Sequence, residues 1–129
     1  MKRFKRKLIV ISTSMAVLLG AVTVSADTES GTINGIIYQT EISASASEAS
    51  AKTIVKADYK TISVTVNAKY YGSNFTGYRT ESASDGGVKR TATATVKMSR
   101  LPGNNTIVSA TSSHSYLNHT STMSLNYIS

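Results

Sequence analysis

The chain has 129 residues, no cysteine, no tryptophan and a formal net charge of +7. Without cysteine it can form neither a disulfide nor a thiolate metal site, so the fold depends on its own core. Five of its 14 basic residues lie within the first seven positions, whereas residues 27–129 keep nine basic and seven acidic residues. The resulting charge of +2 comes with no basic cluster larger than Lys89-Arg90, and we expect no nucleic-acid partner.

The first 26 residues have the three parts of a secretory signal peptide. A positive n-region comes first, formed by Lys2, Arg3, Lys5, Arg6 and Lys7. Residues 8–21 are largely apolar, and Val24-Ser25-Ala26 then supplies the small side chains that a signal peptidase reads. The apolar run is shorter than the roughly 20 residues that span a bilayer, which disfavours a membrane anchor. The sequence therefore predicts cleavage after Ala26.

Residues 27–129 are expected to form a single secreted domain without a transmembrane segment. The short, strongly basic signal is typical of a bacterial protein. We expect the mature protein to be extracellular or loosely associated with the cell surface, in a Gram-positive bacterium. Ser and Thr supply 32 of the 103 residues in this segment. Few large apolar side chains are left for burial, so we predict a thin core and modest stability.

The segment 60–71 is the clearest strand of the chain and is expected to be central. Its apolar residues share one parity: Ile62, Val64, Val66, Ala68 and Tyr70. Polar residues and Tyr71 occupy the other parity. Successive side chains of a strand point to opposite faces, so this alternation predicts one buried and one solvated face.

The other elements are read from alternation and from turn residues. We expect a loose N-terminus over 27–32 and a strand over 36–46. Residues 44–56 are ambiguous between helix and strand, and we favour a strand that is bent or split near Glu48. A loop over 72–77, a short strand over 78–83, a turn at Ser84-Asp85-Gly86-Gly87 and a strand over 88–98 follow the central strand. A turn at Pro102-Gly103, a strand over 106–117, a turn over 118–120 and a strand over 122–128 complete the chain.

About six or seven short strands with regular turns are typical of an all-β fold. We predict a small antiparallel β-sandwich, with an Ig-like or barrel-like arrangement as the alternative.

No known catalytic motif is present, and we predict that the protein is not an enzyme. His114 and His119 are the only histidines, and no carboxylate follows Asp85, so we expect neither a metal site nor a cofactor. Ser112 lies two residues from His114 and shares its face of the strand, but the sequence supplies no orienting acid for a triad. Buried or solvated histidines without a catalytic role are the simpler interpretation.

Tyrosine is the more suggestive residue type, because seven occur in a chain with few other aromatics. Exposed tyrosines on a rigid sheet bury a large area at low entropic cost when they bind a glycan or a protein. The alternative is that tyrosine replaces the missing Phe and Trp in the core. We predict a contact patch at Tyr71, Phe75 and Tyr78, around the glycine-bracketed loop.

The expected function is binding or interaction at a cell surface, with a glycan or a protein as the partner. Polar strand edges also make self-association an expectation. In its signal, its lack of cysteine and its Ser/Thr-rich strands, the chain resembles small secreted β-proteins of Gram-positive bacteria, some of which are bacteriocins of the lactococcin type. A secreted bacteriocin-like antimicrobial or toxin-like protein is therefore the alternative.

Overall fold

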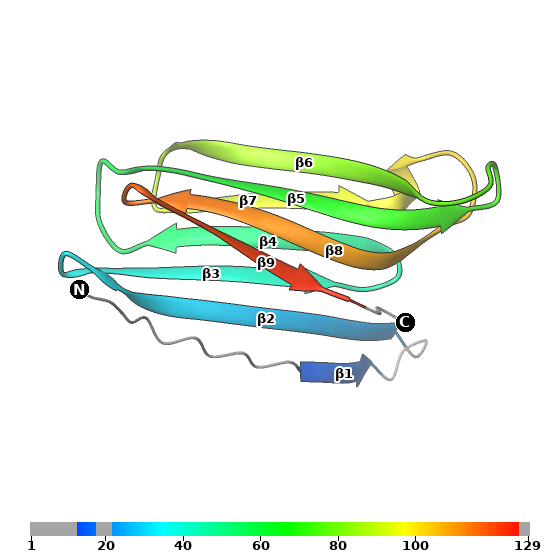
Figure 1. Ribbon diagram of the computed structural model, residues 1–129, viewed down its shortest axis with the longest axis horizontal. Helices are drawn as coiled ribbons and strands as arrows, with labels where there is room; N and C mark the ends of the chain where they lie inside the picture. The colour runs from blue at the N-terminus through cyan, green and yellow to red at the C-terminus, as the bar shows by residue number, and fades with distance from the viewer. Residues whose placement is uncertain (1–12, 18–21, 127–129) are drawn as a thin grey trace.

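The computed structural model describes residues 13–17 and 22–126, with side chains from residue 25 onward, as two packed antiparallel sheets (Figure 1). The strands are β1 (Thr13–Val17), β2 (Val22–Ile33), β3 (Ile36–Ala44), β4 (Glu48–Val55), β5 (Thr61–Gly72), β6 (Arg79–Val88), β7 (Thr91–Lys97), β8 (Asn105–Tyr116) and β9 (His119–Leu125); a 3-10 turn, η1 (Met98–Arg100), follows β7. Sheet A has the order β1-β2-β3-β4-β7, and sheet B has the order β6-β5-β8-β9. The predicted β-sandwich is confirmed. The sheets do not close into one cylinder, so the barrel alternative is wrong.

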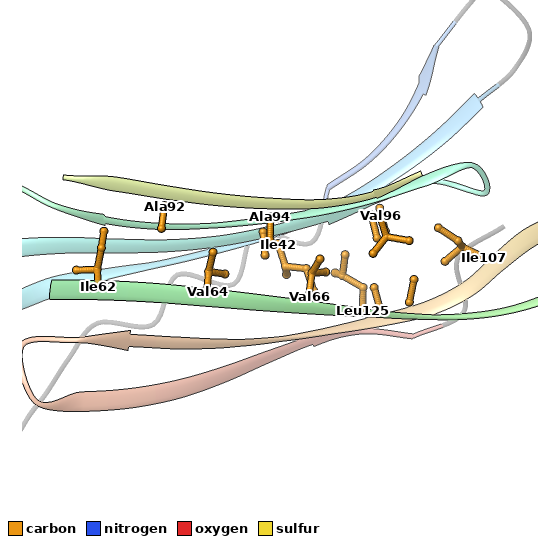
Figure 2. Packing of buried hydrophobic residues seen from close by; sticks show 14 of the residues in the cluster. Ile42, Ile62, Val64, Val66, Ala92, Ala94, Val96, Ile107 and Leu125 are labelled. Atoms are coloured by element: carbon orange, nitrogen blue, oxygen red, sulfur yellow. The ribbon is translucent and has the colours of Figure 1, made fainter. Parts of the chain in front are cut away.

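Strand β5 is central, as its alternation predicted. It pairs with β6 on one side and β8 on the other, and it packs across the sandwich against β4 and β7. Ile62, Val64 and Val66 are each 1 % exposed or less. Figure 2 shows these three side chains pointing into the space between the sheets, toward Ala92, Ala94 and Ile42. The core is thin because small residues, above all alanines, face it from β4, β7 and β8.

Two hairpins close with two-residue turns that fix their registers. Asn34 and Gly35 have φ angles of 51° and 79°, and Leu117 and Asn118 have φ angles of 49° and 63°. Two consecutive positive φ angles are the signature of a type I′ turn, whose twist matches that of the flanking strands. Ile33 therefore lies opposite Ile36, and Tyr116 lies opposite His119.

The N-terminal region differs from the expectation. Residues 27–32, predicted as a loose terminus, belong to β2 and pair with β3 as far as the Asn34-Gly35 turn. Apolar and polar residues alternate only weakly in this segment, so the sequence did not indicate a strand. The Asn34-Gly35 turn fixes its pairing with β3. Of the predicted signal peptide, residues 1–12 and 18–21 lie outside the described residues. Its described parts are β1 and the start of β2, and cleavage after Ala26 stays a prediction.

The predicted turn at residues 84–87 is wrong, because β6 runs through it to Val88. Gly86 pairs with Ser63, and a Cβ at Gly86 would lie only 3.0 Å from the carbonyl oxygen of Ile62. The glycines thus permit a close approach to β5 instead of a reversal. The chain reverses two residues later, at Lys89-Arg90, so that β6 is longer and β7 shorter than expected.

The other predicted boundaries hold within a few residues. Residues 48–55 form strand β4, as favoured over a helix, and of the two arrangements left open the chain is split, at residues 45–47 directly before Glu48. The last turn lies at Leu117-Asn118, and β9 begins at His119 instead of residue 122. Residues 127 and 128 of the predicted last strand lie outside the described residues.

Candidate functional site

Two of the three predicted contact residues meet on the outer face of sheet B. Tyr71 lies near the end of β5, and Tyr78 is the last residue of the loop at residues 73–78, directly before β6. Their rings are in edge-to-face contact, with centroids 6.3 Å apart and an interplanar angle of 86°. Tyr71 is 47 % exposed and Tyr78 is 61 % exposed. The Nζ of Lys69 lies 4.8 Å from the centroid of the Tyr78 ring, a cation–π distance. These three residues form what we call the tyrosine patch.

Phe75 lies away from this patch. Its ring packs edge-to-face on Tyr70, with centroids 5.6 Å apart, and it borders the hydrophobic core. Arg79 covers the same ring, with its guanidinium carbon 4.1 Å from the centroid. Tyr70 and Tyr71 point to opposite faces of β5, so the ring that stacks on Tyr70 is on the inner side. Phe75 thus anchors the loop, and Tyr71 and Tyr78 carry its exposed surface.

The loop is held by the neighbouring turn at residues 101–104. The backbone N–H of Ser73 donates a hydrogen bond to the carbonyl of Asn104 at 3.0 Å, and the backbone N–H of Asn104 donates one to Ser73 Oγ, also at 3.0 Å. Gly72 is required at the start of the loop, because a Cβ there would collide with Asn105 Oδ1 and lie 3.0 Å from the Phe75 ring. These contacts give the two exposed tyrosines a fixed support, which lowers the entropy that binding would cost.

A shallow depression of about 340 Å³ lies beside Tyr78. It is lined by Lys69, Tyr78, Val108, Ser109 and Asn126. A β-bulge shapes it: Lys69 pairs with Ser109 but Tyr70 pairs with Ile107, so that Val108 is an extra residue on β8. Hydroxyl, amide and ammonium groups therefore converge next to an aromatic ring, the combination that orients a ligand in a small site.

The outer face of sheet B extends from this depression as a surface of hydroxyl groups. The outward polar side chains include Thr61, Ser63, Thr65, Asn67 and Lys69 on β5; Thr80, Ser82 and Ser84 on β6; Ser109, Thr111, Ser113 and Ser115 on β8; and Thr120, Thr122 and Ser124 on β9. Lys69 is the one charged side chain among them. Hydrogen bonds tie some of these groups together across the strands, including Thr65 Oγ1 to Ser84 Oγ at 2.8 Å and Ser82 to Asn67.

The inner face of sheet B contains a histidine network. His114 is fully buried, with Ser112 Oγ 2.7 Å from its Nε2 and Thr53 Oγ1 2.8 Å from its Nδ1. Thr53 donates its own hydroxyl proton to the carbonyl of Ser63 at 3.0 Å. The Thr53 oxygen must then accept a proton from Nδ1, which leaves Nε2 as the acceptor for Ser112. The network thus assigns the neutral Nδ1–H tautomer.

The Ser112–His114 pair has the spacing of a nucleophile and its base, but a threonine takes the position of the orienting acid. Ser112 is only 2 % exposed, so no substrate reaches its hydroxyl while the sheets are packed. Burial lowers the pKa of His114 from 6.5 to about 4, and a hydrogen bond with the Lys52 backbone opposes that change only in part. The pair is a satisfied polar contact within the core.

His119 is exposed at the start of β9, where its Nδ1 lies 3.3 Å from the carbonyl oxygen of Leu117. Within the described part of the chain, no three His, Cys, Asp or Glu side chains gather as a metal site. The same residues contain no helix that is long and apolar enough to cross a membrane.

Comparison with known protein families, curated proteins and solved structures gave no match to this chain.

Sequence reasoning missed most of the depression. Lys69 shares the outward parity of Tyr71, so the alternation of β5 contained the signal that places it there. Val108, Ser109 and Asn126 had no such signal, because the bulge that places the half-buried Val108 beside the depression has no glycine to mark it. The sequence also could not predict whether His114 is buried, since Ser112-Ser113-His114-Ser115 has polar residues on both faces of the strand.

Proposed function

We propose that the protein is a secreted, non-enzymatic β-sandwich that binds an uncharged glycan at a cell surface. The observation that carries the proposal is the exposed pair Tyr71 and Tyr78 beside a depression lined by polar groups. Tyrosine rings offer an apolar face to the C–H groups of a sugar, and hydroxyl and amide groups nearby bond to its oxygens.

The support behind the patch favours binding by a preformed surface. Tyr71 and Tyr78 contact each other, Lys69 contacts Tyr78, and the loop between them is bonded to residue 104. Side chains that are already ordered lose little conformational entropy when a ligand arrives. Because little conformational entropy is lost on binding, this open site can hold a ligand without enclosing it.

The charge of the surrounding face favours a neutral ligand. Most outward residues of sheet B carry hydroxyl groups; the exceptions on β5 and β6 are Asn67, Lys69, Gly86 and the exposed Val88. An anionic polymer would meet a single lysine there, whereas a neutral glycan would meet a continuous row of donors and acceptors. A surface with one charged side chain over four strands contrasts with the mixed charges typical of exposed sheet faces.

The decisive experiment compares alanine variants of two exposed tyrosines at opposite ends of β5. The purified protein is tested on an array of neutral oligosaccharides, and the best binder is titrated by calorimetry. Tyr78→Ala should weaken binding about tenfold or more, equal to about 1.4 kcal/mol, because it removes one wall of the depression. Tyr59→Ala is the matched control, since Tyr59 is 91 % exposed but lies before β5, away from the patch.

Equal losses in the two variants, or an array without a neutral ligand, would contradict the proposal. Binding to whole cells that protease treatment abolishes would instead indicate a protein partner. The antimicrobial alternative stays a prediction, which growth inhibition of related bacteria by the purified protein would test.

A further inference from the structure

The outer edge of β2 already accepts a strand. β1 pairs with it in antiparallel fashion, from Thr13 opposite Ala26 to Val17 opposite Val22. Both sides of this pairing fall within the predicted signal peptide. Cleavage after Ala26 would remove β1 together with the part of β2 that it covers, and residues 27–33 would become the edge of sheet A.

The Asn34-Gly35 turn decides which backbone groups this edge presents. In a two-residue hairpin the flanking residues, Ile33 and Ile36, form a hydrogen-bonded pair, and every second pair beyond them does the same. The odd-numbered residues of β2 therefore direct their N–H and C=O groups at β3. The even-numbered residues Thr28, Ser30 and Thr32 direct theirs to the outer edge.

This edge has few of the features that keep edge strands apart. Residues 27–33 contain no proline and no lysine, and their pairing with β3 has no bulge. The outward side chains of Thr28, Ser30 and Thr32 are small hydroxyls. The two acidic residues, Asp27 and Glu29, have the inward parity, which is the one protective feature present.

We propose that the processed chain, which begins at Asp27, forms a two-fold symmetric dimer by antiparallel pairing of residues 27–33 of two β2 strands. In the full chain β1 lies on the same side of β2, at residues 22–26, and the second copy pairs with the segment that follows. Sheet A then continues across the two-fold axis from one copy into the other. This inference does not depend on glycan binding, although two tyrosine patches on one particle would raise avidity for a repeating ligand.

The positions of the acidic residues select the register. A two-fold axis at Ser30 pairs Thr28 with Thr32 of the second copy through their outward backbone groups. It also places Glu29 opposite Gly31 and Asp27 opposite Ile33, so no carboxylate faces another. Moving the axis to Glu29 would set two glutamates directly opposite each other, which is unfavourable. The Ser30 register also uses the whole segment 27–33.

The opposite flank of the sandwich is less suited to pairing. There β6 and β7 lie close together, and Asp85 of β6 accepts the backbone N–H of Thr93 of β7 at 3.0 Å. Lys89 binds the same carboxylate at 3.1 Å. An N–H that would otherwise be free at the β7 edge is thereby satisfied, and charges cover this side.

The test uses the absence of native cysteine. The full chain is secreted from a Gram-positive host, and the product in the medium is identified by mass and studied by sedimentation velocity. Ser30→Cys should form a disulfide-linked dimer on mild oxidation, since residues opposite each other in a hydrogen-bonded pair have Cα atoms about 5.5 Å apart, within disulfide reach. Thr122→Cys is the control, because Thr122 occupies the equivalent outward position at the middle of the β9 edge.

A second pair of variants removes one outward N–H from each edge. Ser30→Pro should raise the dimer dissociation constant at least tenfold, and Thr122→Pro should leave it unchanged, with circular dichroism as the check of folding. A chain that starts at Asp27, dimerises, and cross-links through position 30 supports the proposal. A monomeric processed chain, cross-linking through position 122 as readily as position 30, or a secreted product that retains β1 overturns it.

Discussion

The two faces of sheet B are built from the same four strands but carry different side chains, mainly apolar on the inner face and mainly polar on the outer face. The inner face packs Ile62, Val64 and Val66 against the other sheet and has one satisfied histidine. The outer face presents hydroxyls and a pair of tyrosines to solvent. Because strand alternation keeps the two sets apart, the inner residues determine stability, and the outer ones are left to determine what the protein binds.

The largest effect is expected where a charge enters the inner face. Val66→Asp places a carboxylate at a fully buried position without a partner, which should cost about 4 kcal/mol or more and prevent folding. Thr65→Asp, one residue away on the outer face, should change the free energy of unfolding by less than about 1 kcal/mol. Urea denaturation measures both. Similar losses for the two variants would show that the faces are assigned wrongly.

The second effect is a pH dependence that comes from His114. The folded-state pKa, about 4, lies below the ordinary value of 6.5, so below pH 6.5 protons bind the unfolded chain preferentially. The stability contributed by the neutral histidine is complete above pH 6.5 and is lost as the pH falls toward 4, by about 3 kcal/mol in total. Unfolding measured from pH 7 to pH 4 gives this curve.

His114→Gln should remove that part of the pH dependence, whereas His119→Gln should keep it because His119 is exposed. Asp58 and Asp85 respond at lower pH, since bonds to Arg90 and to Thr93 hold the pKa of each carboxyl below 3.8. Their contribution is present in both variants. Identical curves for the two histidine variants would mean that the burial of His114 has no thermodynamic effect.

The smallest effect compares a hydroxyl buried between the sheets with one on the outer face of sheet B. Thr53→Val removes the group that bonds both to the Ser63 carbonyl and to the His114 ring, and should cost about 2 kcal/mol. Thr65→Val removes a solvated hydroxyl that bonds only to Ser84, and should be within about 0.5 kcal/mol of the parent chain. Thermal unfolding at neutral pH distinguishes the two. A neutral Thr53→Val would indicate that the inner network does not contribute to stability.

Much of the fold follows from alternation in the sequence. The pattern of Ile62, Val64 and Val66 identified both the central strand and its buried face, since large β-branched residues on one parity have no other simple interpretation. It failed where side chains are small or absent. Gly86 and Gly87 suggested a turn, but tertiary contact with β5 holds them in a strand.

The candidate site was predictable only in part. Tyr71 and Tyr78 are recognisable because aromatic residues flank a loop bounded by Gly72 and Gly77. That Phe75 faces inward depends on its contacts with Tyr70 and Arg79, which are tertiary and have no local sequence signal.

The stacked pair Tyr38 and Tyr116 gives the molecule a spectroscopic property of its own. Tyr38 belongs to sheet A and Tyr116 to sheet B, and their rings lie 4.6 Å apart with planes inclined by 25°. A near-ultraviolet circular dichroism signal from such coupled chromophores requires the two sheets to be docked, and no tryptophan is present to mask it. Far-ultraviolet dichroism follows the strands themselves. Compared with the part of the near-ultraviolet signal that comes from Tyr38 and Tyr116, as distinct from the Tyr71–Tyr78 pair within sheet B, it distinguishes the assembly of each sheet from the closing of the sandwich.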